Sequence, residues 1–458
     1  MTDAELIKHL WTHKTQDHPV FSDEELMIER GEGIYVWTRE GVKLIDAYAG
    51  LSVVNVGHGR VEIADAMREQ AAKLSYYPTT RQFSNRPAAE LAARLAALTP
   101  GDLKYTLYAV SGAEANERSI QIARHYWLKV GRPRKYKVIS LHGGYHGGTI
   151  GTLAVCGSAE LAKPYEPLQW RGFTKVTVPY SYRDRGNGTD EELVRRCSDQ
   201  LADAIHAEDP ETVAAVILEP VLSSGGCIIP PLGWLQRVRD ICDQLDVLMI
   251  ADEVITGFGR TGKWFGVQHE DVVPDLMSVA KGITSGYLPL SASIARSRIA
   301  DAFPEDSPEE NVHPNTYCGH PVACAAGLAN LAIIERENLV QNADRMGLRL
   351  RDAIAKGIGG LPIVGEVRNR GLMVGVEMVD PNNKAKPLAK DLVASLNVRA
   401  WRRGAIPWAK GNILRLAPPL CITAAEVDEL ARIIGACVSE LQDEVTRSRR
   451  SRVGAAAG

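Results

Sequence analysis

Apolar runs and helical repeats alternate through the middle of the chain. Residues 212–220, TVAAVILEP, form a nearly continuous apolar run that is typical of a buried strand, and residues 247–254, VLMIADEV, form another. Between them, residues 234–246 place their apolar side chains on one helical face. These side chains are Leu235, Val238, Ile241, Cys242 and Leu245. Strands that are apolar on both faces and joined by a helix predict a parallel sheet covered by helices.

The same alternation occurs upstream. YTLYAV (105–110) precedes a helical stretch at 113–130, and YKVISL (136–141) precedes the glycine-rich HGGYHGG (142–148). Repeated units of this kind predict an α/β domain with a mostly parallel sheet flanked by helices.

The pattern changes in the last part of the chain. GLMVGVEMV (371–379) and ILRLAPPL (413–420) predict strands of a smaller, separate α+β domain. A closing helix follows at 423–445, where Thr423 and Glu426 have the spacing of a capping box. A chain of 458 residues is too long for one compact core, so two domains are expected.

Composition and charge exclude several classes of function. The net charge of −3 gives no electrostatic reason to expect binding to nucleic acid or to an acidic membrane surface. No apolar run is long enough to cross a bilayer, and the N-terminal stretch does not resemble a signal peptide. The eight cysteines form no CxxC pair, and no HExxH motif occurs. We therefore expect reduced, mostly buried thiols, a cytoplasmic location and no metal site.

Asp252 follows the apolar residues 247–251, at the carboxyl end of the predicted strand. Ligands of parallel α/β sheets bind at this end of the strands. Because strand residues alternate, Asp252 and Val254 should face one side and Glu253 the other. A buried carboxylate needs a cationic or hydrogen-bonding partner, and the protonated ring nitrogen of a flat cofactor would serve. The alternatives are that Asp252 caps the next turn or pairs with an arginine such as Arg260.

Two glycine-containing stretches could bind a phosphorylated or planar group. Ser111-Gly112-Ala113 stands between a predicted strand and a helix, where backbone N–H groups can bind a phosphate. Many strand-to-helix turns contain Ser-Gly, so an ordinary helix cap is the alternative. In HGGYHGGT, glycines flank Tyr145 and His146 and leave room for a planar group over the tyrosine ring. A loop with a packed aromatic is the alternative.

Lys281 follows a short apolar run and precedes a glycine in AKGITSGYLPLSA. Buried lysines are uncommon, and one with a lowered pKa can form a Schiff base. A lysine whose amine reaches solvent is the alternative.

Taken together, these stretches resemble the class III (ω-amino acid, or amine:pyruvate) aminotransferases, which are pyridoxal-phosphate enzymes of fold type I. The resemblance covers nearly the whole chain. The matching stretches are HLWTHKTQ, NVGHGR, SGAEANE, YHGGT, ILEPV, ADEVITGFGRTG, AKGITSGYLPLSA, TYCGHPVACAAG, VRNRGLMVGVE and LRLAPPL. It implies a large cofactor-binding domain at 56–328 and a small domain made from 1–55 and 329–458.

The resemblance also assigns roles around the cofactor. Lys281 should form the Schiff base with pyridoxal phosphate, and Asp252 should hold its ring nitrogen protonated. Val254 should back one face of the ring. Tyr145 should stack on the other face, near the donor, with His146 beside it.

Further roles concern the phosphate and the substrate. Ser111, Gly112 and Ala113 should bind the phosphate. Thr316 should reach the phosphate of a neighbouring subunit, because the family forms homodimers with shared active sites. Glu219 should lie near the cofactor's O3′ side, and Arg415 should receive a substrate carboxylate through its planar fork. A surface ion pair is the alternative for Arg415.

Two departures from the family bear on the substrate. Ala113 replaces the serine that many relatives have in SGSEAN, so one hydroxyl contact to phosphate is lost. Ser52, after Leu51, stands where many amine:pyruvate members have tryptophan, and these two residues are candidate substrate contacts. Replacing an indole by a hydroxymethyl group should open the pocket to bulkier amines. Further candidates for this pocket are Tyr76, Tyr77 and Arg81 in LSYYPTTRQF, with packing at a helix end as the alternative.

The implied reaction is ping-pong transfer of an amino group from an amine or ω-amino acid to a keto acid, by analogy pyruvate. Lys281 should move a proton between the donor carbon and the cofactor. An aminomutase, a racemase or a decarboxylase would use the same cofactor and lysine. The sequence does not identify the donor, its enantiomer or the acceptor.

Overall fold

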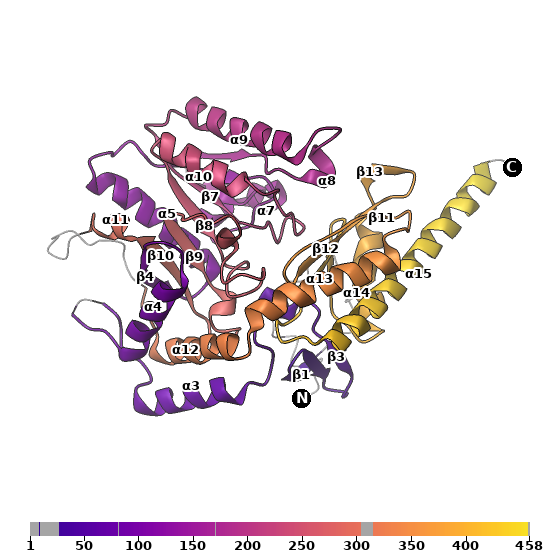
Figure 1. The fold of residues 1–458 in the computed structure, drawn as a ribbon, viewed down its shortest axis with the longest axis horizontal. Helices are drawn as coiled ribbons and strands as arrows, with labels where there is room; N and C mark the ends of the chain where they lie inside the picture. The colour runs from indigo at the N-terminus through magenta and orange to yellow at the C-terminus, as the bar shows by residue number, and fades with distance from the viewer. Residues whose placement is uncertain (1–8, 10–26, 81, 170, 304–314, 457–458) are drawn as a thin grey trace. The chain divides into compact units, whose positions relative to one another are not determined.

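A computed structural model describes residues 9, 27–80, 82–169, 171–303 and 315–456. Its contacts divide the chain into two compact units (Figure 1). The large unit comprises residues 52–56 and 60–344, and the small unit comprises 1–51, 57–59 and 345–458. The first boundary falls within the irregular turn α2 (Ala49–Ser52) and the second within α13 (Leu339–Ile358).

A seven-stranded sheet forms the centre of the large unit, in the order β4-β10-β9-β8-β7-β5-β6. The strands are β4 (Leu103–Ala109), β5 (Lys137–Leu141), β6 (Phe173–Val176), β7 (Val213–Leu218), β8 (Leu248–Asp252), β9 (Leu276–Val279) and β10 (Ser291–Arg296). The run from β6 to β9 pairs in parallel, whereas β10 is antiparallel to both of its neighbours. The predicted mostly parallel sheet is therefore confirmed.

Helices surround this sheet. They are α3 (Val61–Lys73), α4 (Arg86–Leu98), α5 (Gly112–Lys129), α6 (Ile150–Val155), α7 (Ala159–Ala162), α8 (Ser181–Asp184), α9 (Asp190–Ala207), α10 (Trp234–Gln244), α11 (Ser297–Ala300) and α12 (Pro321–Arg336). Short 3-10 turns occur at η2 (Lys163–Leu168), η3 (Gly266–His269) and η4 (Lys281–Ile283). Helix α5 lies on β8, β9 and β10, and α9 packs with α10 over β6 and β8. Figure 1 shows α3 and α12 side by side below the sheet.

The packing of α12 explains where the large unit ends. This helix lies against α3 and α4, so it belongs to the large unit even though the sequence suggests a boundary at residue 328. Helix α12 is apolar almost all round, as expected of a helix buried on several sides. The transition to the small unit comes only after residue 344.

The small unit contains two antiparallel sheets. The first has the order β1-β2-β3, with β1 (Ile28–Glu32), β2 (Tyr35–Thr38) and β3 (Lys43–Ile45). The second has the order β11-β12-β15-β14, with β13 paired to β12; these are β11 (Val364–Arg370), β12 (Met373–Asp380), β13 (Asn383–Pro387), β14 (Trp408–Lys410) and β15 (Ile413–Leu416). The helices α14 (Lys390–Trp401) and α15 (Ala424–Ala456) complete the unit.

The predicted capping box at the start of α15 is present. The backbone N–H of Thr423 donates to a carboxylate oxygen of Glu426 at 2.8 Å, and the N–H of Glu426 donates to the Thr423 hydroxyl at 3.4 Å. All eight cysteines lie among the described residues, and all but the partly buried Cys421 are buried, as expected. In the described part of the chain, none of the helices is long and apolar enough to cross a membrane.

The face of β8 that carries Asp252 is set by strand alternation. Leu248 and Ile250 share that face and pack with Ile120 and Ala123 of α5 in the main apolar core. Asp252 continues the same row at the end of the strand. The sheet and α5 together therefore deliver its carboxylate to the edge where the strands end.

Candidate active site

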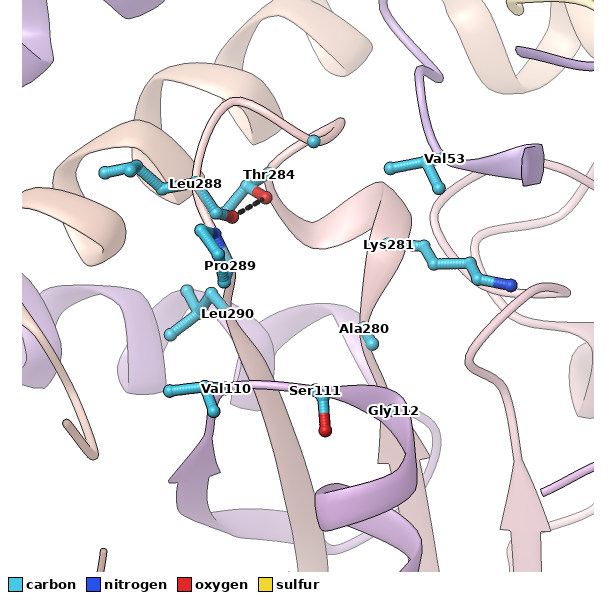
Figure 2. Close-up of a pocket in the computed structure, with 11 residues that line it drawn as sticks. Val53, Val110, Ser111, Gly112, Ala280, Lys281, Thr284, Leu288, Pro289 and Leu290 are labelled. Carbon is cyan, nitrogen blue, oxygen red and sulfur yellow. Dashed lines mark hydrogen bonds between the residues drawn. The ribbon is translucent and has the colours of Figure 1, made fainter. Parts of the chain in front are cut away.

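A cavity of about 230 Å³ opens in the large unit, where β4 and β9 end and α5 begins (Figure 2). Three residues named from the sequence, Ser111, Gly112 and Lys281, line it. The other lining residues are Val53, Val110, Ala280, Thr284, Gly286, Leu288, Pro289 and Leu290. The wall is thus largely apolar, with one amine and two hydroxyls.

The electrostatics around Lys281 favour a partly neutral amine. Burial lowers its pKa to about 8, although the charges of Asp252 and Glu219 act in the opposite direction. Arg260 adds a smaller lowering effect. A lysine amine with such a pKa is a usable base and nucleophile near neutral pH.

Asp252 is buried and firmly held. Its Oδ2 accepts a hydrogen bond from Asn116 Nδ2 at 2.7 Å and lies 2.7 Å from His146 Nδ1. Its Oδ1 accepts from the N–H of Val254 at 3.0 Å, so Asp252 also caps the following turn, one of the alternatives left open by the sequence. Arg260, the arginine named in the other alternative, is fully buried and donates to Asn55 Oδ1 at 2.8 Å.

Glu253 separates from Asp252 as strand alternation predicts. Its carboxylate is fully buried and accepts from the N–H groups of Gly266 and Val267, each at 2.8 Å, and from the Thr256 hydroxyl. The second carboxylate therefore closes the loop between residues 253 and 267. Each of the two acidic residues at the end of β8 therefore has its own set of partners.

The loop that carries Tyr145 and His146 is tied to two carboxylates. Burial lowers the pKa of His146, but its hydrogen bond to Asp252 and the negative charge there outweigh burial and raise the pKa overall. Glu219 accepts from the N–H of Tyr145 at 2.9 Å and from the N–H of Ser223 at 3.1 Å. Burial raises the pKa of Glu219 to about 7, opposed by His146.

The start of α5 has the features of a phosphate site. Ser111 caps the helix by accepting from the N–H of Glu114 at 3.2 Å, which leaves the first-turn N–H groups directed outward. A Cβ at Gly112 would lie 2.8 Å from a methyl carbon of Val254, so glycine allows this close contact. Likewise, a Cβ at Gly147 would lie 2.4 Å from that of Ala113.

Other residues named from the sequence lie apart from the cavity wall. Thr316 is exposed, and its carbonyl accepts from the Tyr76 hydroxyl at 2.5 Å. Ser52 is 2 % exposed and adjoins the lining residue Val53. Tyr77 is 42 % exposed and packs on Phe83, whereas Arg81, another candidate for the substrate pocket, lies outside the described residues.

Leu51 and Arg415 belong to the small unit. Leu51 is 54 % exposed. Arg415 lies on β15 and is only 5 % exposed, and its guanidinium carbon lies 6.0 Å from the ring centre of Tyr48. It is therefore not an ordinary surface arginine.

Sequence reasoning missed Asn116. This residue is buried on α5, and its amide donates both to Asp252 and, at 2.9 Å, to the carbonyl of His146. It thus joins the carboxylate to the glycine-rich loop. Its position four residues after Gly112 in SGAEANE, on the same helical face, was the available signal.

These residues fit a flat phosphorylated ring with a basic nitrogen. The buried carboxylate of Asp252, held by His146 and Asn116, matches the ring nitrogen. The amine of Lys281 matches an aldehyde on the ring, and the glycine-containing start of α5 matches the phosphate. Pyridoxal phosphate has all three parts.

Comparison with known proteins agrees. The family model described as Aminotransferase class-III matches residues 18–438. An (S)-enantioselective ω-transaminase from Thermomicrobium roseum has a TM-score of 0.92 at 40% identity, covering 96% of this chain and 99% of that one. The ω-transaminase of Pseudomonas jessenii, solved in complex with PMP, has a TM-score of 0.93 at 33% identity, covering 97% and 99%. The putrescine–pyruvate aminotransferase of Pseudomonas aeruginosa is 35% identical over 442 residues, covering 94% and 96%.

The chain therefore belongs to the class III aminotransferases. It is a transaminase of fold type I that uses pyridoxal phosphate.

Proposed function

We propose that this enzyme moves an amino group from an amine or ω-amino acid to pyruvate by a ping-pong mechanism. The main support for the proposal is that Lys281 lines the same cavity as the start of α5. Its amine has a lowered pKa and lies close enough to Asp252 and Glu219 for their charges to affect that pKa. The putrescine–pyruvate relative and the ω-transaminase structures support this substrate class.

Pyridoxal phosphate supplies an aldehyde carbon that bonds amines and a ring that accepts electrons. Lys281 is the residue that holds the cofactor covalently and then carries a proton from the donor carbon. A pKa of about 8 leaves part of this amine neutral near neutral pH, as a base requires. Asp252 keeps the ring nitrogen protonated, and His146 and Asn116 fix the direction of its carboxylate.

Other roles are those that the family resemblance implies, and the local contacts support them. Ser111, Gly112 and Ala113 bind the phosphate at the start of α5. Glu219, which accepts the N–H of Tyr145, would lie on the O3′ side of the cofactor, and Tyr145 and Val254 would hold its ring from the two faces. Burial raises the pKa of Glu219, so this carboxyl can hold a proton near neutral pH.

Substrate recognition involves the remaining candidates. Leu51 and Ser52 contact the amine donor, and Arg415 binds the carboxylate of the keto acid through its planar fork. In a cytoplasmic homodimer, Thr316 of each subunit completes the phosphate site of the other. The exposure of Thr316 is consistent with this role.

The test begins with Lys281→Ala. Borohydride reduction of the cofactor-loaded wild type should attach the cofactor at Lys281, as peptide mass spectrometry would detect. The variant should lose this adduct, and its rate of amine conversion in a single turnover should fall by about 10²–10⁴-fold or more. Lys137→Ala removes an amine that pairs with Glu208 at 2.8 Å, and this control should keep both properties.

Attachment at a different lysine would refute the assignment. Net conversion of amine to carbonyl product should also require pyruvate in equal amount. Repeated turnover of the donor without a keto acid, with an amine rather than a carbonyl compound as product, would instead indicate a decarboxylase, a racemase or an aminomutase, which the relatives do not favour.

A further inference from the structure

The backbone at Lys281 has an unusual conformation. Lys281 opens the 3-10 turn η4 with φ of +47°, in the left-handed region that non-glycine residues avoid. Ser285 (φ +51°) and Gly286 (φ +79°) follow in the same region. Such a conformation persists only where the surroundings hold it. The residues that hold this turn therefore decide where the lysine side chain points.

Asn330 is the main contact that holds the turn. It lies on α12 and is fully buried. Its Nδ2 donates to the carbonyls of Gly282 at 2.8 Å and Ile283 at 3.1 Å, and its Oδ1 accepts from the Ser285 hydroxyl at 2.6 Å. The side-chain amide of Asn330 thus makes three hydrogen bonds, two as donor and one as acceptor, with the four residues after Lys281.

The approach of α12 to the turn depends on small residues. A Cβ at Gly327, one helical turn before Asn330, would lie 3.4 Å from the carbonyl oxygen of Ile283 and 3.0 Å from a methyl carbon of Leu91. A Cβ there would require the Leu91 side chain to shift by a few tenths of an ångström. Glycine at 327 therefore suits the close packing of α12 against the turn.

The other side of the turn is held by the segment before α3. Asn55 is buried, donates to the carbonyl of Phe258 at 2.9 Å, and lies so near Gly282 that a Cβ there would be 2.5 Å from its amide nitrogen. The N–H of Val56 donates to the Ser285 hydroxyl at 3.2 Å. Asn330 and this segment therefore both hold the turn through the Ser285 hydroxyl.

We propose that Asn330 is a positioning residue for Lys281: by fixing the left-handed turn, it sets where the lysine amine stands during proton transfer. Its amide carries no charge, and its hydrogen bonds go to the turn that follows Lys281, so it acts through the backbone. The charged groups near that amine are Asp252, Glu219 and Arg260. The inference rests on the proposed role of Lys281.

The test compares Asn330→Ala with a matched control, Asn397→Ala. Asn397 is also a buried helical asparagine, and it exchanges two hydrogen bonds, of 2.9 and 2.8 Å, with the backbone of Ala409 in the small unit. Both variants should lower the melting temperature. Only Asn330→Ala should slow single-turnover amine conversion, by about 10–100-fold with an unchanged half-saturating amine concentration, because misplaced reacting groups cost rate rather than binding.

A second readout does not depend on activity. The visible absorbance of the cofactor bound at Lys281 changes with pH, and its midpoint reports the surroundings of that nitrogen. Asn330→Ala should shift this midpoint, whereas Asn397→Ala should leave it at the wild-type value. Wild-type rate and midpoint in Asn330→Ala, or equal changes in both variants, would overturn the inference.

If Asn330→Ala does not fold, Ser285→Ala decides the question. It removes the partner of Asn330 Oδ1 but keeps both donated bonds, so a smaller change in the same direction is expected, and no change would overturn the inference. Borohydride trapping of the wild type separates the two proposals. An adduct at another lysine refutes both, whereas an adduct at Lys281 with unaltered kinetics in the variants refutes only the role of Asn330.

Discussion

Ser52 is the residue at which this chain departs most clearly from the tryptophan found in many amine:pyruvate relatives. Its side chain is buried, its φ is +57°, and its hydroxyl has no hydrogen-bond partner among the described residues. A small side chain that makes no polar contact here is consistent with a gain of room beside Val53, a residue of the cavity wall.

Ser52→Trp should therefore narrow the range of donors. For a graded series of amines, kcat/KM of the bulkiest donors should fall by about tenfold or more relative to the smallest, because filling a pocket discriminates by size. Ser52→Ala, which keeps the space, should retain the wild-type profile. If the wild type already rejects all but small amines, the idea of an enlarged pocket fails.

Glu253 links a single residue to the pH dependence of stability. Burial raises its pKa from 4.5 to about 7, although the Thr256 hydroxyl and two backbone N–H groups favour the charged form. The folded protein then holds a proton that the unfolded chain releases between those values. The stability gained from this proton is complete below pH 4.5 and is lost as pH rises through 7.

Glu253→Gln should flatten this dependence. As pH rises, Glu253 should lower the free energy of unfolding by roughly 3 kcal/mol, since each pKa unit corresponds to about 1.4 kcal/mol. The variant should be less stable overall, because its amide NH₂ faces donor groups, but its melting temperature should fall less between pH 5 and pH 8. Glu90→Gln, at a partly exposed pair with Arg86, should keep the wild-type slope. An unchanged slope in Glu253→Gln would contradict the assignment.

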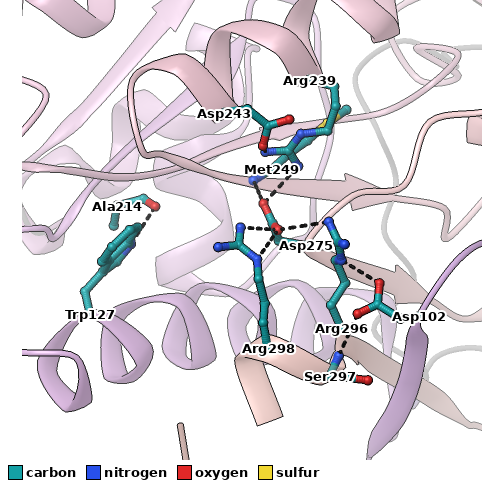
Figure 3. Close-up of polar contacts among 10 residues, drawn as sticks. All are labelled: Asp102, Trp127, Ala214, Arg239, Asp243, Met249, Asp275, Arg296, Ser297 and Arg298. Carbon is teal, nitrogen blue, oxygen red and sulfur yellow. Dashed lines mark hydrogen bonds and ion pairs between the residues drawn. The ribbon is translucent and has the colours of Figure 1, made fainter. Parts of the chain in front are cut away.

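At the scale of elements, Asp275 fastens several parts of the large unit together (Figure 3). Its fully buried carboxylate lies 2.9 Å from a guanidinium nitrogen of Arg239 on α10 and 2.6 Å from one of Arg298 on α11. It also accepts from the N–H of Met249 on β8 at 2.8 Å. One carboxylate at the start of β9 thus joins two helices and a neighbouring strand.

Asp275→Asn should destabilise the fold strongly. Loss of the negative charge leaves the buried Arg239 without its main counter-charge, which typically costs about 3–5 kcal/mol. Asp243→Asn, at the exposed end of the same cluster, should cost about 1 kcal/mol or less. The melting temperatures of the two variants test this expectation. Similar values would show that Asp275 does not stabilise the packing of these elements more than Asp243 does.

The elements also show what sequence patterns can predict. The unit from β7 through α10 to β8 was predictable because its apolar residues follow strand and helix periods over long runs. The reversed direction of β10 was not, since a strand buried on both faces has the same apolar run in either direction. The sequence likewise predicted α10 to reach residue 246, but the helix ends at Gln244 before the left-handed Asp246.

The same limit applies to the site. Asp252 and Lys281 could be selected because a charge at the end of an apolar strand is conspicuous. Asn116 had only its helical spacing from Gly112 to mark it, and Asn330 had no such mark, since an asparagine within a helix has no distinctive pattern of its own and its partners are remote in sequence. Their importance becomes visible only once the fold brings them to a carboxylate and to a turn.

At the scale of the whole molecule, the small unit is assembled from both ends of the chain. The backbone around β3 exchanges hydrogen bonds with residues far along the sequence: the N–H of Ile45 donates to Gly404, and the N–H of Ala417 donates to Ala47. The intervening residues 60–344 lie almost entirely within the large unit. The order along the chain therefore differs from the order of the structural units.

This arrangement has a consequence for synthesis on the ribosome. The large unit has all its strands once residue 296 has emerged, and can begin to fold while translation continues. Strand β3, although made among the first and paired with β2 on one edge, must wait for residues 404–417 before its other edge finds the partners of Ile45 and Ala47. A nascent chain that stalls in between would expose the edge of β3 that β2 does not cover, as a surface for chaperones or for aggregation.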